Sequence, residues 1–167
     1  YALEYAVGWA NKLGKPLLIY EGLNCDYPWA CDRFHKFILE GMAENSREAA
    51  GLGINYYPFV ENEPGAGKGL LYRLAEKAAL VISDEYPVFI MRDQNERVAG
   101  KIDKKFTTVD SNGLIPLGMT EKAPYNAYFF RKIMQRHFVE AYTNPPETNP
   151  LQSLNNRNNI DLPERFT

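Results

Sequence analysis

The segment LVISDEYP (residues 80–87) begins like a buried strand and ends in two acids, an aromatic residue and a proline. The run 79–83 is short and apolar up to Ile82, which is typical of a strand covered on both faces in an α/β protein. Asp84 and Glu85 follow at its carboxyl end, and a proline turns the chain before the apolar run 88–91. Acids at such a strand end indicate the rim of a ligand site.

Further apolar runs alternate with helical patterns along the chain. The patterns predict strands at 16–20, 54–60, 79–83 and 106–109, and helices at 2–13, 32–51, 70–78, 91–102 and 125–142, with Asp32 as an N-cap. Strict alternation with short connections favours parallel strands with helices on both faces, a three-layer, Rossmann-like, doubly wound α/β sheet. Such sheets bind ligands at the carboxyl ends of their strands. We therefore expect a functional edge in the loops after residues 20, 60, 83 and 109.

The chain of 167 residues has the size of one domain, followed by a segment of different composition. Residues 1–143 carry the α/β pattern. Residues 144–167 contain four prolines and six asparagines with almost no periodicity, which predicts a linker or arm toward a second domain. Because the chain opens at Tyr1 directly in a helical pattern, we also expect that a segment precedes it.

The composition is that of a globular protein, with 45% hydrophobic and 24% charged residues. A net charge of -2 argues against a surface built mainly to hold a nucleic-acid backbone. Apolar runs are all far shorter than the roughly 20 residues of a membrane helix, and no signal-peptide pattern opens the chain. We therefore expect a cytoplasmic protein without a membrane partner, in which Cys25 and Cys31 are free thiols and no metal site is present.

The segment PGAGKG (residues 64–69) lies between a predicted strand and helix, where a phosphate-binding loop would lie. However, Asn62 stands where that motif has its first glycine, and Gly69 stands where it has a hydroxyl for magnesium. A tight turn explains the segment better.

Three other features have both structural and functional interpretations. Arg33 is either a partner in a surface salt bridge or a clamp for an anionic ligand. Asp84 and Glu85 lack a histidine, lysine or serine partner in sequence, so they suit ligand positioning or helix capping better than catalysis. The segment 110–113, DSNG, is either a turn or a ligand contact. We predict no catalytic residue in this chain.

Several stretches, in order and spacing, resemble the N-terminal α/β domain of the photolyase/cryptochrome family. They are YALEYA (1–6), KPLLIY (15–20), RFHKFILEGM (33–42), SDEYP (83–87), VDSNGLIP (109–116) and YNAYFFRK (125–132). The stretch 109–116 is similar to a class II photolyase pattern, with Ser-Asn-Gly in place of Ala-His-Asn. The family's first strand would lie just before Tyr1 and is absent from this chain.

The resemblance implies a light-driven lyase that repairs cyclobutane pyrimidine dimers in UV-damaged DNA. FAD would lie in a C-terminal helical domain that also binds the DNA, so this fragment alone would be inactive. The α/β domain would house an antenna chromophore, either a deazaflavin, a folate or a flavin. Carried over by position, Arg33 and Phe37 would flank this chromophore on one side, and Asp84, Glu85 and Tyr86 would line the other.

Two alternatives share this architecture. One is a nucleotide-binding protein of the adenine-nucleotide hydrolase-like type, which would require a better phosphate loop than residues 64–69. The other is a cryptochrome-like signalling or interaction module with a vestigial cleft.

Overall fold

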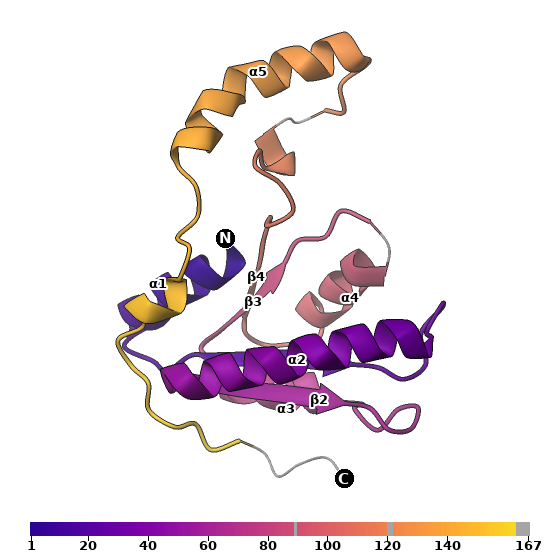
Figure 1. Cartoon of the computed structure of the whole chain (residues 1–167), viewed down its shortest axis with the longest axis vertical. Helices are drawn as coiled ribbons and strands as arrows, with labels where there is room; N and C mark the ends of the chain where they lie inside the picture. The colour runs from indigo at the N-terminus through magenta and orange to yellow at the C-terminus, as the bar shows by residue number, and fades with distance from the viewer. Residues whose placement is uncertain (89, 120–121, 163–167) are drawn as a thin grey trace.

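A computed structural model of the chain describes residues 1–88, 90–119 and 122–162 (Figure 1). Its helices and strands alternate in the order expected from the sequence. The elements are α1 (Ala2–Leu13), β1 (Leu18–Leu23), α2 (Asp32–Leu52), β2 (Asn55–Val60), α3 (Leu70–Lys77), β3 (Leu80–Asp84), α4 (Ile90–Ala99), β4 (Lys105–Val109), η1 (Leu117–Met119), α5 (Ala127–Thr143) and η2 (Pro150–Ser153). The predicted α/β class is confirmed.

Glycines end the first two helices as the pattern predicts. Gly14 and Gly53 adopt left-handed φ angles of 62° and 66°, which close α1 and α2 without the steric cost that a side chain would bring. Two boundaries differ from prediction. Cys31, not Asp32, is the N-cap of α2, and β1 continues to Leu23 instead of ending near Tyr20. Glu21 therefore lies within a strand.

The strands of the described residues form two separate parallel pairs. β1 pairs with β2 from Leu18 opposite Asn55 onward, and β3 pairs with β4 from Leu80 opposite Lys105 onward. The parallel pairing agrees with the sequence, but the single sheet that we expected is divided in two. The two pairs are turned relative to each other, and α2 lies across the β1–β2 pair (Figure 1).

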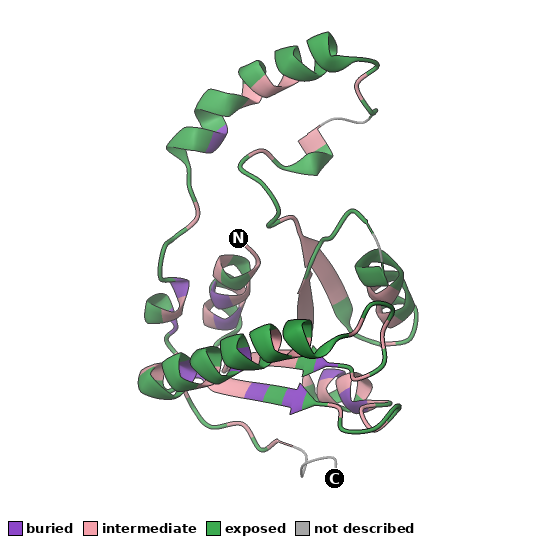
Figure 2. Ribbon diagram, turned by 45° about the vertical axis from the view of Figure 1, so that its right-hand side comes forward, coloured by how far each residue is buried: buried purple, intermediate pink, exposed green. Residues whose placement is uncertain are grey.

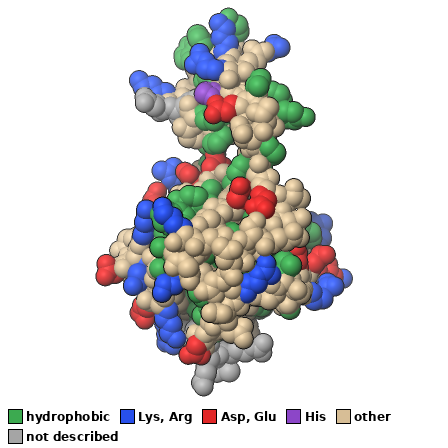
Figure 3. Space-filling model, turned by 90° about the vertical axis from the view of Figure 1, so that its left-hand side faces the viewer, with side chains coloured by type: hydrophobic (Ala, Val, Ile, Leu, Met, Phe, Trp, Pro, Cys, Tyr) green, Lys and Arg blue, Asp and Glu red, His purple; other side chains and the backbone are tan. Residues whose placement is uncertain are grey.

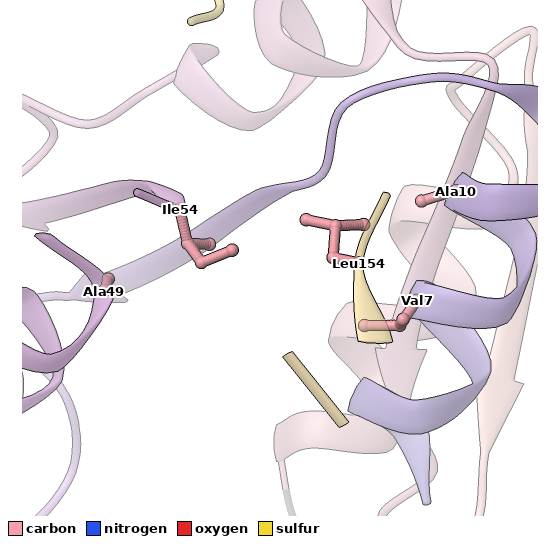
Figure 4. Close-up of a cluster of buried hydrophobic side chains, with 5 residues drawn as sticks. All are labelled: Val7, Ala10, Ala49, Ile54 and Leu154. Atoms are coloured by element: carbon pink, nitrogen blue, oxygen red, sulfur yellow. The ribbon is translucent and has the colours of Figure 1, made fainter. Parts of the chain in front are cut away.

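Two clusters of buried side chains hold the β1–β2 half together. One joins α1, α2 and the start of β2 to the C-terminal arm; its members are Val7, Ala10, Ala49, Ile54 and Leu154 (Figure 4). The other packs β2 against α3 and consists of Tyr57, Phe59 and Leu70. Most of the other described residues are exposed or half-buried (Figure 2).

The described part of the predicted arm, residues 144–162, packs against α1 and the end of α2. η2 packs against α1, and Leu154 is buried at 4% exposure. The guanidinium of Arg157 donates hydrogen bonds to the backbone carbonyls of Leu52, Leu151, Gln152 and Leu154. This arm therefore closes over the α1 end of the molecule. Whether it leads to another domain stays a prediction, and residues 163–167 lie outside the described part.

α5 stands away from the body, joined to it by extended segments (Figure 1). Ala141 is its one buried residue in the described structure. Large side chains along the helix are about half exposed or more, namely Tyr128, Phe129, Phe130, Phe138, Val139 and Tyr142. Hydrophobic side chains accordingly gather on this upper part of the molecule (Figure 3). A helix with so much exposed apolar surface usually packs against a partner.

The chain exposes much more surface than its mass requires. A compact monomer of 19.1 kDa has about 8,400 Å² of accessible surface by the general scaling with mass. This chain exposes 12,137 Å². α5 contributes to this excess, because its large apolar side chains are about half exposed or more. No described helix combines the length and the apolar character needed to cross a bilayer.

Candidate functional site

Asp84, Glu85 and Tyr86 lie together at the carboxyl end of β3, as predicted. Their backbone is held firmly: the Glu85 N–H donates to the Val109 carbonyl at 2.8 Å, and Asn95 Nδ2 donates to the Asp84 carbonyl at 2.9 Å. Asn112 Nδ2 donates to the Glu85 carbonyl. All three side chains remain exposed. The result is a fixed rim of two carboxylates and one phenol that can accept hydrogen bonds from a ligand.

The apolar run 88–91 is largely exposed in its described part. Val88, Ile90 and Met91 are 48%, 45% and 40% exposed, and Phe89 lies outside the described residues. Ile90 and Met91 instead begin α4.

Arg33 and Phe37 occupy the first two turns of α2, away from the rim formed after β3. Both side chains are exposed, Phe37 at 77%. The Arg33 guanidinium lies 5.6 Å from the ring centre of its neighbour Phe34, and the ion pairs in the described part of the chain do not include it. No described contact joins Arg33 or Phe37 to the three residues of the rim. The structure thus places three of the five predicted residues together at the rim and leaves the other two, Arg33 and Phe37, separate from it.

Asp110 organises the loop that follows β4. Its carboxylate accepts hydrogen bonds from the Leu117 N–H at 2.6 Å and from the Asn112 N–H at 3.0 Å. Burial alone would raise the pKa of Asp110, but these hydrogen bonds outweigh it and lower the pKa. Because the carboxylate is engaged by its own loop, the turn interpretation of residues 110–113 is the better one.

Glu61 holds the glycine-rich loop, and sequence reasoning missed it. One carboxylate oxygen accepts from the N–H groups of Gly65 and Gly67, at 2.8 and 3.3 Å. The other accepts from the N–H of Cys25 at 3.1 Å and from its thiol at 3.5 Å. Burial alone would raise the pKa of Glu61, but these donors outweigh it and lower the pKa.

This carboxylate accepts hydrogen bonds from the backbone N–H groups that a phosphate in this loop would require. The loop's inward N–H groups already have an anionic partner, so an incoming phosphate would meet a negative charge. Gly67 also permits close packing, because a Cβ there would lie 2.6 Å from the ring of Phe59. An acid directly after a strand and before a run of glycines is the signal that could have identified this arrangement.

A cleft of about 1,460 Å³ separates the two strand pairs. It is lined mainly by apolar residues of α1, β1, α3 and β3, and of the five predicted site residues Asp84 alone borders it. A polar group on its wall was also missed. Tyr56 donates to the Glu21 carboxylate at 2.5 Å, and Asn45 donates to the same oxygen at 3.1 Å. Burial and then the Glu21 carboxylate raise the pKa of Tyr56, so this phenol is a fixed donor and not a base.

Within the described ranges, no three His, Cys, Asp or Glu side chains come together in a way that could hold a metal ion.

Comparison with known proteins gives one informative relative, and no family model matches the chain. The chain is 30% identical over 138 residues to the deoxyribodipyrimidine photo-lyase of Methanothermobacter thermautotrophicus (strain Delta H). This similarity supports membership of the chain in the photolyase family. The match covers 82% of the chain but only 30% of the relative's length. It therefore informs on one part of such a protein and not on the remainder.

Proposed function

We propose that this chain is the N-terminal α/β part of a deoxyribodipyrimidine photo-lyase, nearest to the class II type. The observation that carries the proposal is the 30% identity over 138 residues to a curated photo-lyase. The alternation of helices with parallel strands and the acidic stretch after β3 agree with it. The complete protein would repair cyclobutane pyrimidine dimers in UV-damaged DNA with light, and would act in the cytoplasm.

In this proposal the chemistry lies outside the chain. FAD, when bound in a following helical domain, would supply the photochemical electron transfer, and this part would be inactive alone. The exposed side of α5, with Phe130, Phe138 and Tyr142, is the surface that we assign to contact with that domain. Its apolar area is large for a surface that faces water.

The finer proposal is an antenna-chromophore site at the carboxyl end of β3. Asp84 and Glu85 suit the polar edge of a deazaflavin, folate or flavin ring, because ionised carboxylates accept hydrogen bonds from ring N–H groups. Tyr86, at 43% exposure, offers a ring for stacking. Arg33 and Phe37 would complete the site only if α2 and β3 approached each other. The two exposed carboxylates at the end of β3 support this ligand class.

The test of the photo-lyase proposal is survival of repair-deficient bacteria after UV irradiation. The complete gene product that contains this chain should restore survival under blue light and not in the dark, whereas residues 1–167 alone should restore none. Equal survival in light and dark with the complete product would contradict the proposal.

A binding measurement separates the antenna site from the nucleotide-binding alternative. The complete protein should bind a deazaflavin and quench its fluorescence. It should not bind ATP, because Glu61 already accepts the N–H groups of the loop at 64–69. A double variant, Asp84→Asn with Glu85→Gln, should weaken deazaflavin binding by about tenfold, the loss of about one hydrogen bond to a charged group. The exposed Asp103→Asn is the matched control. Unchanged affinity in the double variant would remove the antenna site from this edge.

A further inference from the structure

Charged side chains are divided between the two ends of the parallel strands. The segments at the carboxyl ends of the strands contain six acids and one lysine; they are residues 24–31, 61–69, 84–88 and 110–116. The segments that lead into β1, β3 and β4 contain one acid and six lysines; they are residues 12–17, 77–79 and 100–105. The net charge of -2 therefore conceals a basic edge at the amino ends of these strands.

The six lysines of these segments form what we call the lysine edge. They are Lys12, Lys15, Lys77, Lys101, Lys104 and Lys105, and all six side chains are exposed. β3 and β4 pair in parallel from their first residues, so the segments before them lie side by side. Lys15, Lys77 and Lys104 border the same cleft. The charges of three separate segments are thus presented close together.

Two of these lysines share one indole ring. The Lys12 ammonium lies 4.6 Å and the Lys105 ammonium 5.4 Å from the ring centre of Trp9. Tyr5 packs against the same indole in an edge arrangement, with 6.3 Å between ring centres. An aromatic face attracts a cation within about 6 Å. The Trp9 ring therefore holds one ammonium from α1 and one from β4 near each other, although their charges repel.

A second aromatic ring holds a further lysine. The Lys101 ammonium lies 5.8 Å from the ring centre of Tyr72, which belongs to α3. Ion pairs do not neutralise these charges within residues 1–88, 90–119 and 122–162, where the two pairs are Lys36 with Glu40 and Arg92 with Glu96. The lysine edge is thus held by aromatic rings and leaves its ammonium groups available to an anionic partner.

The partner that fits such an edge carries many fixed anions at close spacing. Duplex DNA has one phosphate charge per about 1.7 Å of its axis, and lysine binds phosphate as a point charge. Base stacking would require a free aromatic face. Because two ammonium groups already contact the Trp9 ring, we assign this ring to holding the lysines and not to stacking. The edge therefore suits the phosphate backbone, without preference for base sequence.

We propose that the lysine edge binds the phosphate backbone of duplex DNA away from the lesion. This inference rests on the photo-lyase function proposed above, which brings duplex DNA to the complete protein. The lysine edge lies at the amino ends of the strands, whereas the proposed chromophore site lies at the carboxyl end of β3, so both are available in one molecule. The contact raises affinity equally for damaged and undamaged DNA.

The salt dependence of DNA binding in the dark tests this proposal. The complete gene product is titrated with a labelled, undamaged duplex from about 50 to about 200 mM sodium chloride, with fluorescence anisotropy as the readout. In the double variant Lys12→Gln with Lys105→Gln, the slope of log affinity against log salt should become shallower by about 2, since each phosphate contact contributes about 0.9. Affinity at about 150 mM salt should fall by at least about tenfold. Lys101→Gln with Lys104→Gln should act in the same direction.

The matched control is Lys36→Gln with Lys68→Gln, which removes the same charge beyond the carboxyl ends of β1 and β2. It should leave the slope unchanged. An unbound duplex at the lowest salt, an unchanged slope in both lysine-edge variants, or an equal change in the control would overturn the proposal. Loss of binding to phosphatidylserine vesicles in those variants, with DNA binding unchanged, would overturn it in favour of a membrane. Because the duplex is undamaged and kept dark, failure here would leave light-dependent repair standing.

Discussion

Replacing Glu61 by glutamine tests how the loop at 64–69 is held. A hydrogen bond to a charged group contributes about 1.5–3 kcal/mol, against about 1 kcal/mol for a neutral pair. Glutamine keeps one oxygen to accept from Gly65 and Gly67, but its amide group then faces the Cys25 N–H and leaves that donor unpaired. The loop is partly open to water, which compensates some of the loss. We expect the free energy of unfolding to fall by about 2 kcal/mol.

The pH dependence gives the same prediction a second readout. Folding lowers the pKa of Glu61, so its charge stabilises the fold above the unfolded pKa of about 4.3. That contribution disappears as the pH falls through the lower, folded pKa. The difference in the free energy of unfolding between wild type and Glu61→Gln should therefore be largest at neutral pH and should become smaller in acid.

The assay is urea unfolding followed by circular dichroism, from about pH 7 to about pH 3. A separate thermal unfolding experiment at neutral pH should show the same loss of about 2 kcal/mol as a midpoint lowered by about 4–8 °C for a domain of this size. Glu63→Gln is the matched control, because that side chain is exposed in the same loop. A Glu61→Gln variant that unfolds like Glu63→Gln at neutral pH, or a gap that stays constant into acid, would refute the reasoning.

Three further variants test the packing, the arm and the cleft wall. Leu70→Ala removes a side chain with 0% exposure and should cost about 2–5 kcal/mol in urea unfolding; a loss below about 1 kcal/mol would contradict the assigned core. Arg157→Lys replaces a guanidinium that donates to several backbone carbonyls by a single ammonium group. Amide hydrogen exchange in residues 150–160 should therefore become faster. Unchanged exchange would contradict the proposed role of Arg157 in holding the arm. In an alkaline titration followed by tyrosine absorbance, Tyr56→Phe should remove a late-titrating phenol, because burial and Glu21 raise the pKa of Tyr56; loss of an early-titrating phenol would contradict this.

Local signals predicted the elements well. Gly14 and Gly53 ended helices where the pattern placed them, because left-handed caps favour glycine whatever lies around them. The acidic end of β3 was also visible, since a short apolar run followed by two acids is a local pattern. β1 extended further than predicted because its pairing with β2, and not its own composition, decides that Glu21 belongs to the strand.

Long-range partners could not be predicted in the same way. Glu61 and Cys25 are 36 positions apart, and Arg157 and Leu52 are 105 apart, so neither contact follows from a local pattern. The division of the sheet has a related cause. Alternation predicts parallel strands but not which strands become neighbours, and among the residues that the structure describes no pairing joins β1 to β3.

The most direct measurement of the central claim is light-dependent repair by the purified complete gene product. We predict that it contains FAD by its absorption spectrum and splits cyclobutane pyrimidine dimers in an oligonucleotide under blue light, with no splitting in the dark. Residues 1–167, purified in parallel, should contain no FAD and split no dimers. A complete protein that bound no FAD and left the dimers intact in the light would contradict the account.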